Sequence, residues 1–96
     1  MTTDNTFVEH AAAFINLANE QALAADVDQV AGSMLLAAAR YCAHVSAGNA
    51  LSADAMREER QAQIDFVMQN FRRLLEGEYD FYIEKFDDLI LGAKAD

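Results

Sequence analysis

Apolar residues recur every three or four positions along most of the chain, which is the spacing of one face of an α-helix. The first stripe predicts a helix over about residues 7–24. Thr6 precedes this helix and Glu9 lies in its first turn, three residues later, which is the spacing of a capping box. In that motif the hydroxyl and the carboxylate each accept a hydrogen bond from a backbone N–H. The stripe consists of Phe7, Ala11, Phe14, Ile15, Ala18 and Ala22.

A second helix is predicted to follow Asp26 or Asp28, since either aspartate can cap it. It is expected to end near Gly48 and Asn49, two residue types that suit a left-handed C-cap conformation. Apolar side chains lie nearly all round this helix, and a helix of that kind is normally buried in the middle of a bundle.

A third helix is predicted to open at Ser52 or Asp54 and to run from about Ala53 to Leu91, with Gly77 as the place where a kink would fall. One apolar stripe keeps its phase through that glycine, with the members Ile64, Met68, Phe71, Leu75, Tyr79, Tyr82, Phe86 and Leu89. Val67, Leu74 and Phe81 widen the stripe to about half of the circumference. One partner helix of the same chain does not cover a face of that width, so we expect a homodimer.

Composition supports the same fold. The 96 residues fit a single domain, 1–96, and the chain holds no proline and only four glycines, the residues that punctuate turns and strands. A chain of this size also buries its apolar surface incompletely, which favours self-association. The predicted fold is therefore all-α: a three-helix bundle with a long C-terminal helix, packing as a homodimer.

The net charge and the single cysteine limit the classes of partner and the cell compartment that fit this sequence. Sixteen acidic residues against seven basic ones give a net charge of −9, which repels phosphate backbones and anionic lipid and argues against binding to nucleic acid or a membrane surface. The one cysteine, Cys42, cannot form an internal disulfide. The start of the chain lacks the pattern of a secretion signal, and no stretch is long and apolar enough to cross a bilayer. We therefore expect a cytoplasmic protein.

Arg40 is the only charged residue between Asp28 and Asp54 and lies on the apolar second helix, where an unpaired buried guanidinium would be costly. Glu78 lies within the apolar face of the third helix and is its natural partner, with Glu20 as a second candidate. A structural ion pair is the first interpretation. The alternative is an anion-binding site built from Arg40, Tyr41 and His44.

Other candidate sites have simpler interpretations. Four carboxylates share one face of the third helix, Glu76, Asp80, Glu84 and Asp87, and a solvated face is preferred over a magnesium site there. Cys42 is expected to be a core thiol. Neither a metal-ligand motif of cysteines and histidines nor a glycine cluster for phosphate is present, so no catalytic residue, metal or other cofactor is predicted.

Three runs carry a family resemblance: Phe14–Glu20, Ala37–Tyr41 and Phe71–Leu75, with Tyr82 beyond them. With them, the chain from about Phe7 to Phe86 resembles a family of short bacterial proteins catalogued as a domain of unknown function, number 3144. The resemblance implies a bacterial cytoplasmic source and an all-α fold, and it supplies no activity. It draws attention to Asn19 and Arg40 as candidate binding residues.

The function predicted from these patterns is that of a non-enzymatic protein-interaction or regulatory bundle with an unidentified protein partner. The alternative is a small-molecule or nucleotide-handling enzyme, or an anion-binding protein, that uses Arg40, His44 and Glu78. A third interpretation, an acidic mimic of nucleic acid, rests on the net charge alone.

Overall fold

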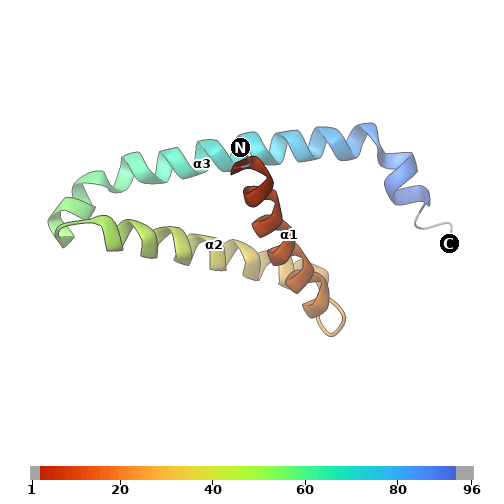
Figure 1. Ribbon diagram of the computed structural model, residues 1–96, viewed down its shortest axis with the longest axis horizontal. Helices are drawn as coiled ribbons and strands as arrows, with labels where there is room; N and C mark the ends of the chain where they lie inside the picture. The colour runs from red at the N-terminus through yellow and green to blue at the C-terminus, as the bar shows by residue number, and fades with distance from the viewer. Residues whose placement is uncertain (1–2, 93–96) are drawn as a thin grey trace. The chain divides into compact units, whose positions relative to one another are not determined.

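The computed structural model shows only helices along the backbone that it describes, residues 3–92; side chains are described for residues 6–92. The elements are α1 (Thr3–Gln21), α2 (Val27–Asn49), α3 (Ala53–Glu84) and the five-residue π-helix η1 (Asp87–Leu91) (Figure 1). The prediction of an all-α chain with three α-helices, the last of them the longest, is confirmed.

The chain divides into two compact units, Met1–Ala50 and Leu51–Asp96, which we call unit 1 and unit 2. Unit 1 holds α1 and α2, and unit 2 holds α3 and η1. The single domain, the packing of all three helices into one bundle and the homodimer stay predictions. None of the helices described is long and apolar enough to cross a membrane.

Helix α1 is displaced toward the N-terminus from its predicted position. It begins at Thr3, so Thr6 lies inside the helix and the predicted capping box at Thr6 is wrong. It ends at Gln21, where the chain tightens: the N–H of Leu23 donates to the carbonyl of Glu20 at 3.2 Å. Bonds of this three-residue spacing close a narrower turn than the α-helix and commonly end one. The helix therefore stops before the predicted end near Ala24.

Both ends of α2 are held in extended backbone. Asp26 is the N-cap, and its carboxylate accepts from the N–H of Asp28 at 3.0 Å, which confirms one of the two predicted caps. At the other end Ala50 is extended, with φ −82° and ψ 145°. Within residues 3–92 no residue has a positive φ, so the predicted left-handed C-cap at Gly48 and Asn49 is wrong, although the predicted end of the helix is right.

Unit 1 has a small core. Figure 1 shows α1 and α2 diverging from the turn that joins them, and the two helices are in contact. Val30, in the first turn of α2, is 8% exposed and is the one buried apolar side chain within residues 6–92. Farther along α2, Leu35 and Leu36 are exposed. Burial of α2 on all sides, as its sequence predicted, does not occur within this unit because α1 covers only its beginning.

Helix α3 starts at a conventional cap and is supported along its length by local polar pairs. Ser52 is the N-cap, as predicted, and its hydroxyl accepts from the N–H of Ala55 at 3.1 Å. Side chains three or four positions apart are then joined in the pairs Arg57–Asp54, Gln61–Asp65, Arg72–Glu76 and Arg73–Asn70. Such pairs stabilise a helix without tertiary contacts. The helix continues through Gly77 unbroken.

The end of α3 departs from the prediction of one helix to Leu91. Lys85 leaves helical geometry with φ −101° and ψ 15°, and the π-helix η1 follows. In η1 the wider spacing is visible in the bond from the N–H of Gly92 to the carbonyl of Asp87. Asp87 and Asp88 are adjacent there, and aspartate is a poor former of helix interiors because its carboxylate competes for nearby backbone groups. The last turns therefore leave the α-helix.

Candidate functional site

The residues proposed for an anion site lie together on one turn of α2. Tyr41 and His44 have their ring centroids 6.2 Å apart with the planes tilted by 40°. Arg40 lies one turn before His44, and all three side chains are exposed, Tyr41 by 70%. The helical spacing thus brings the three together, and their role as an anion site stays a prediction. They form an open surface patch of unit 1, whereas anion sites that bind tightly are usually recessed.

Arg40 has no carboxylate partner among residues 6–50, the part of unit 1 whose side chains the structure describes. No ion pair forms within residues 6–50, so neither Arg40 nor Glu20 is paired there. Both side chains are exposed. Ser33, on the same helix, donates its hydroxyl to the carbonyl of Val30 at 2.9 Å. An exposed guanidinium is solvated and needs no partner. The pair with Glu78 of unit 2 stays a prediction.

Asn19 lies on α1 and is exposed. Glu78 lies on α3 in unit 2, also exposed. Within residues 6–92 the side chains of these two residues make no hydrogen bond. Their binding roles stay predictions.

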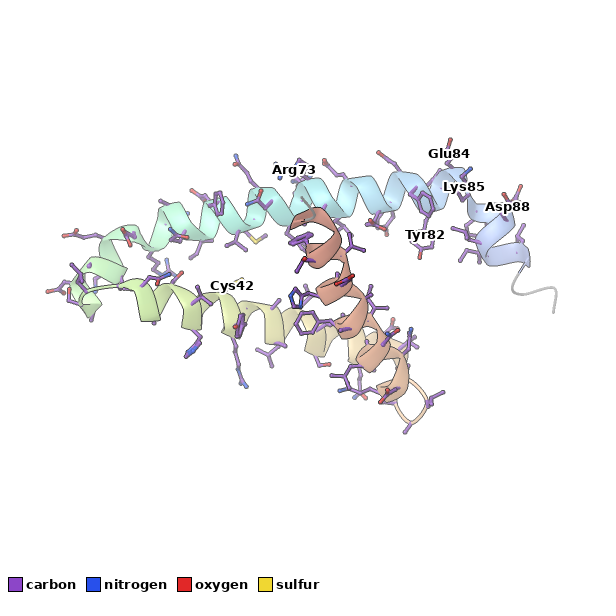
Figure 2. The ribbon with its side chains drawn as sticks, in the orientation of Figure 1. Cys42, Arg73, Tyr82, Glu84, Lys85 and Asp88 are labelled. Carbon is purple, nitrogen blue, oxygen red and sulfur yellow. The ribbon has the colours of Figure 1, made fainter. Side chains whose placement is uncertain are left out.

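Cys42 is exposed on α2 (Figure 2), so the prediction of a core thiol is wrong. The error follows from the expectation that α2 is covered on every side. His44, two positions along the helix, projects in another direction and does not face the thiol. An activated cysteine nucleophile needs a base within hydrogen-bond reach, so Cys42 has no support as a catalytic residue.

The acidic stripe of α3 is shorter than predicted. Glu76, Asp80 and Glu84 belong to α3, whereas Asp87 lies beyond it in η1. Glu76 accepts from Arg72 at 3.3 Å, which leaves it paired already. Glu76 and Glu84 are eight residues apart, which is about 12 Å along the helix axis at 1.5 Å per residue. Among the side chains of residues 6–92, no group of three His, Cys, Asp or Glu is placed to hold a metal ion.

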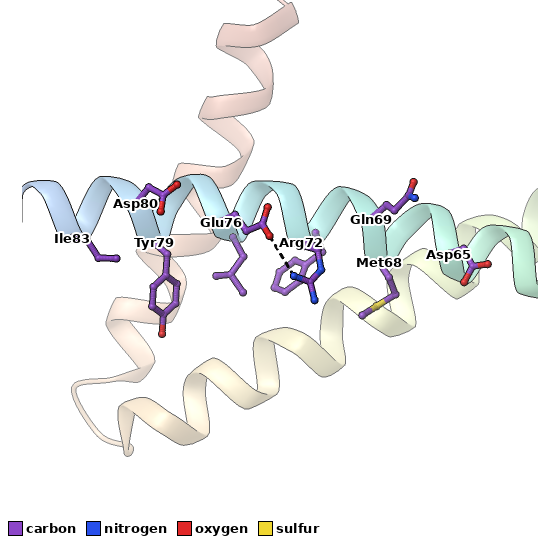
Figure 3. A pocket seen from close by; sticks show the side chains of 10 residues that line it. Asp65, Met68, Gln69, Arg72, Glu76, Tyr79, Asp80 and Ile83 are labelled. Carbon is purple, nitrogen blue, oxygen red and sulfur yellow. Dashed lines mark hydrogen bonds and ion pairs between the residues drawn. The ribbon is translucent and has the colours of Figure 1, made fainter.

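A shallow groove runs along one side of α3 (Figure 3) and was not predicted from the sequence. Its lining comes from α3 alone and consists of Asp65, Met68, Gln69, Phe71, Arg72, Leu75, Glu76, Tyr79, Asp80 and Ile83. One edge is apolar and the other carries the Arg72–Glu76 pair. Because a single helix is convex, the groove is open to solvent. It suits an elongated partner better than an enclosed small molecule.

The apolar stripe beside that groove is the most conspicuous surface of unit 2. We call it the α3 apolar face, and within α3 it comprises Ile64, Val67, Met68, Phe71, Leu74, Leu75, Tyr79, Phe81 and Tyr82. These side chains are between 38% and 65% exposed, and no residue of α3 is buried. Phe81 and Tyr82 contact each other edge to face, with ring centroids 5.7 Å apart. A contiguous apolar surface of this kind marks an interaction site in soluble proteins.

Comparison with known proteins identifies a family. The family model described as "Protein of unknown function (DUF3144)" matches residues 7–83. The match confirms the resemblance seen in the sequence. No curated protein and no solved structure matches the chain.

Proposed function

The chain belongs to the DUF3144 family of proteins of unknown function, and on that premise we propose that it is a non-enzymatic interaction or regulatory protein that acts through helix association. Its first partner is a second copy of itself. A further protein partner would bind the assembled dimer.

The exposure of the α3 apolar face carries this proposal. Burying one Leu or Phe side chain stabilises a complex by roughly 1.5–3 kcal/mol, so several such residues on one face provide a strong driving force. Residues 51–92 of unit 2 hold no second α-helix to cover them. The width of the face, about half of the helix circumference, matches a partner helix or helix pair laid along it.

The remaining features fit an acidic protein that works among other proteins. A net charge of −9 disfavours nucleic acid and anionic membranes as partners. The free, exposed thiol of Cys42 fits a reducing compartment, and we place the protein in the bacterial cytoplasm. The small-molecule or nucleotide-handling alternative rests on the sequence pattern of Arg40, His44 and Glu78 alone.

The mass in solution tests the proposal. Tyr82→Asp places a charge in the α3 apolar face, where it is expected to weaken self-association by about 2 kcal/mol or more, the size of an interface hot spot. Size-exclusion chromatography with light scattering should give twice the 10.6 kDa chain mass for the wild type and the chain mass for Tyr82→Asp.

Phe66→Asp is the matched control. Phe66 is 63% exposed and lies five positions before Phe71, which turns it away from the α3 apolar face. This variant should stay dimeric, and circular dichroism should show that both variants remain helical. A monomeric wild type, or a Tyr82→Asp variant of unchanged mass, would contradict the proposal.

A further inference from the structure

Two charged residues interrupt the α3 apolar face, one on each side of the middle of α3 and at about equal distances from it. Arg60 and Glu78 are 18 residues apart, about five turns at 3.6 residues per turn, so they lie on the same line along the helix. Ile64, Val67 and Phe71 lie between them on the same face. This part of the face is therefore an apolar segment with the positive charge of Arg60 at one end and the negative charge of Glu78 at the other.

Neither charge has an ion-pair partner among residues 51–92. The ion pairs of α3 are Arg57–Asp54 and Arg72–Glu76, and Arg60 and Glu78 take part in no ion pair within residues 51–92. Covering the α3 apolar face would desolvate both groups. A charge that becomes buried destabilises the complex unless an opposite charge meets it.

The positions along α3 indicate how that pairing is met. The midpoint between Arg60 and Glu78 is residue 69, and the midpoint of α3 falls between residues 68 and 69. When two copies of α3 lie antiparallel with full overlap, Arg60 of each copy therefore comes opposite Glu78 of the other. The same register brings Val67 opposite Phe71, so apolar residues fill the space between the two ion pairs.

We infer that α3 associates with α3 of a second copy in antiparallel orientation, centred near Gln69 and closed at each end by an Arg60–Glu78 ion pair. The inference rests on the self-association proposed above and adds its geometry. It also gives Glu78 a partner in the second copy in place of Arg40.

The overall charge of α3 and η1 favours the same orientation. Residues 53–73 carry four arginines and four acidic residues, whereas residues 74–92 carry one lysine and six acidic residues. A parallel dimer in register would set the acidic halves against each other and would oppose Arg60 to Arg60 and Glu78 to Glu78. Like charges brought together in this way disfavour the parallel arrangement. The antiparallel arrangement sets each acidic half against a balanced one.

Charge reversal tests the ion pairs. Arg60→Glu and Glu78→Arg should each raise the dimer dissociation constant by roughly 10-fold to 100-fold, since each creates two like-charge contacts. The double variant restores both contacts, so its dissociation constant should return to within about threefold of the wild-type value. In a parallel dimer the single variants would differ little from the wild type.

Arg40→Glu is the control for the alternative pairing. If Arg40 is the partner of Glu78, then Arg40→Glu with Glu78→Arg would restore dimerisation and Arg60→Glu with Glu78→Arg would not. That outcome would overturn the inference. Sedimentation of all variants at several concentrations measures the dissociation constants.

Distances between spin labels test the orientation without changing any interface charge. In a Cys42→Ser background, a nitroxide is attached at Glu58→Cys or at Gln69→Cys, two positions on the side of α3 away from the apolar face. Antiparallel pairing centred at residue 69 separates the labels at 58 by about 33 Å along the axis, at 1.5 Å per residue, and places those at 69 level with each other. Pulsed electron resonance should therefore give a much longer distance for 58 than for 69.

The possible results separate the two proposals. A dimer with similar distances at both positions would overturn the antiparallel inference and leave self-association intact. A monomer at all concentrations would overturn both.

Discussion

Units 1 and 2 form their helices by different means. In unit 2 the single long helix α3 has a serine cap and four side-chain pairs at helical spacing, yet it buries none of its residues. In unit 1 no side-chain pair of that kind supports α1 or α2 among the residues described, the two helices are in contact, and Val30 of α2 is buried. Local polar pairs thus support the helix of unit 2, whereas unit 1 lacks them and has one buried apolar side chain.

This difference indicates what each unit has left for a partner. Local polar pairs support α3 along its length, and within unit 2 its apolar face is exposed, so that face can serve association. Helix α2 is apolar on nearly every side and lacks local pairs, so it gains its stability from whatever packs against it. An interaction protein benefits from the first arrangement, because its binding helix is ordered before the partner arrives.

Val30→Asp should have the largest effect on unit 1. It places a carboxylate in the one buried apolar position of the described chain, without a partner, and is expected to lower the free energy of unfolding by at least about 3 kcal/mol. Val27→Asp is the matched control, since Val27 is 63% exposed and lies in the first turn of α2, where a negative charge is favourable. Urea unfolding followed by circular dichroism measures both; equal stabilities would show that unit 1 does not depend on packing.

Ser52→Ala should have an intermediate effect on unit 2. It removes the hydroxyl that accepts from the N–H of Ala55 and is expected to cost about 1 kcal/mol. Ser52→Asp keeps a capping oxygen and should retain the wild-type stability. Thermal unfolding of the two variants provides the comparison, and no difference between them would argue against local control of α3.

Glu76→Gln should have the smallest effect. The Arg72–Glu76 pair is 3.3 Å long, and its side chains are 78% and 63% exposed, so its contribution is about 0.3–0.5 kcal/mol in dilute salt. At about 1 M salt the screening length falls to about 3 Å, and the difference from the wild type should vanish. Melting temperatures of the variant and the wild type at low and high salt measure this difference. A lower melting temperature of the variant that persists in high salt would mean that the pair stabilises α3 by something other than charge attraction.

Local signals predicted much of the fold. Asp26 and Ser52 were recognisable as caps because each precedes an apolar periodic run, and the phase of the stripe predicted correctly that α3 continues through Gly77. The errors lie where several weak preferences compete. Thr6 matches a capping box, yet the helix begins earlier at Thr3, and the stripe beyond Glu84 keeps its spacing in sequence while the backbone changes to a π-helix.

Burial and pairing were harder to predict, since they depend on which surfaces meet. Cys42 looked like a core residue because its neighbours are apolar, but composition does not reveal what covers a helix. Arg40, Tyr41 and His44 share one turn of α2 because helical spacing alone fixes that relation, whereas their role as a binding site stays a prediction. The groove along α3 depends on side-chain conformations and left no recognisable motif in the sequence.

The backbone also has a consequence for how freely this sequence can vary. Since no residue within 3–92 takes a positive φ, none of the glycines there is required by its conformation. An added Cβ at Gly32, Gly48 or Gly77 would meet no atom within 4 Å. A survey of all single substitutions should therefore find these glycines among the tolerant positions, with the selective constraint concentrated on the helix surfaces that recognise another chain.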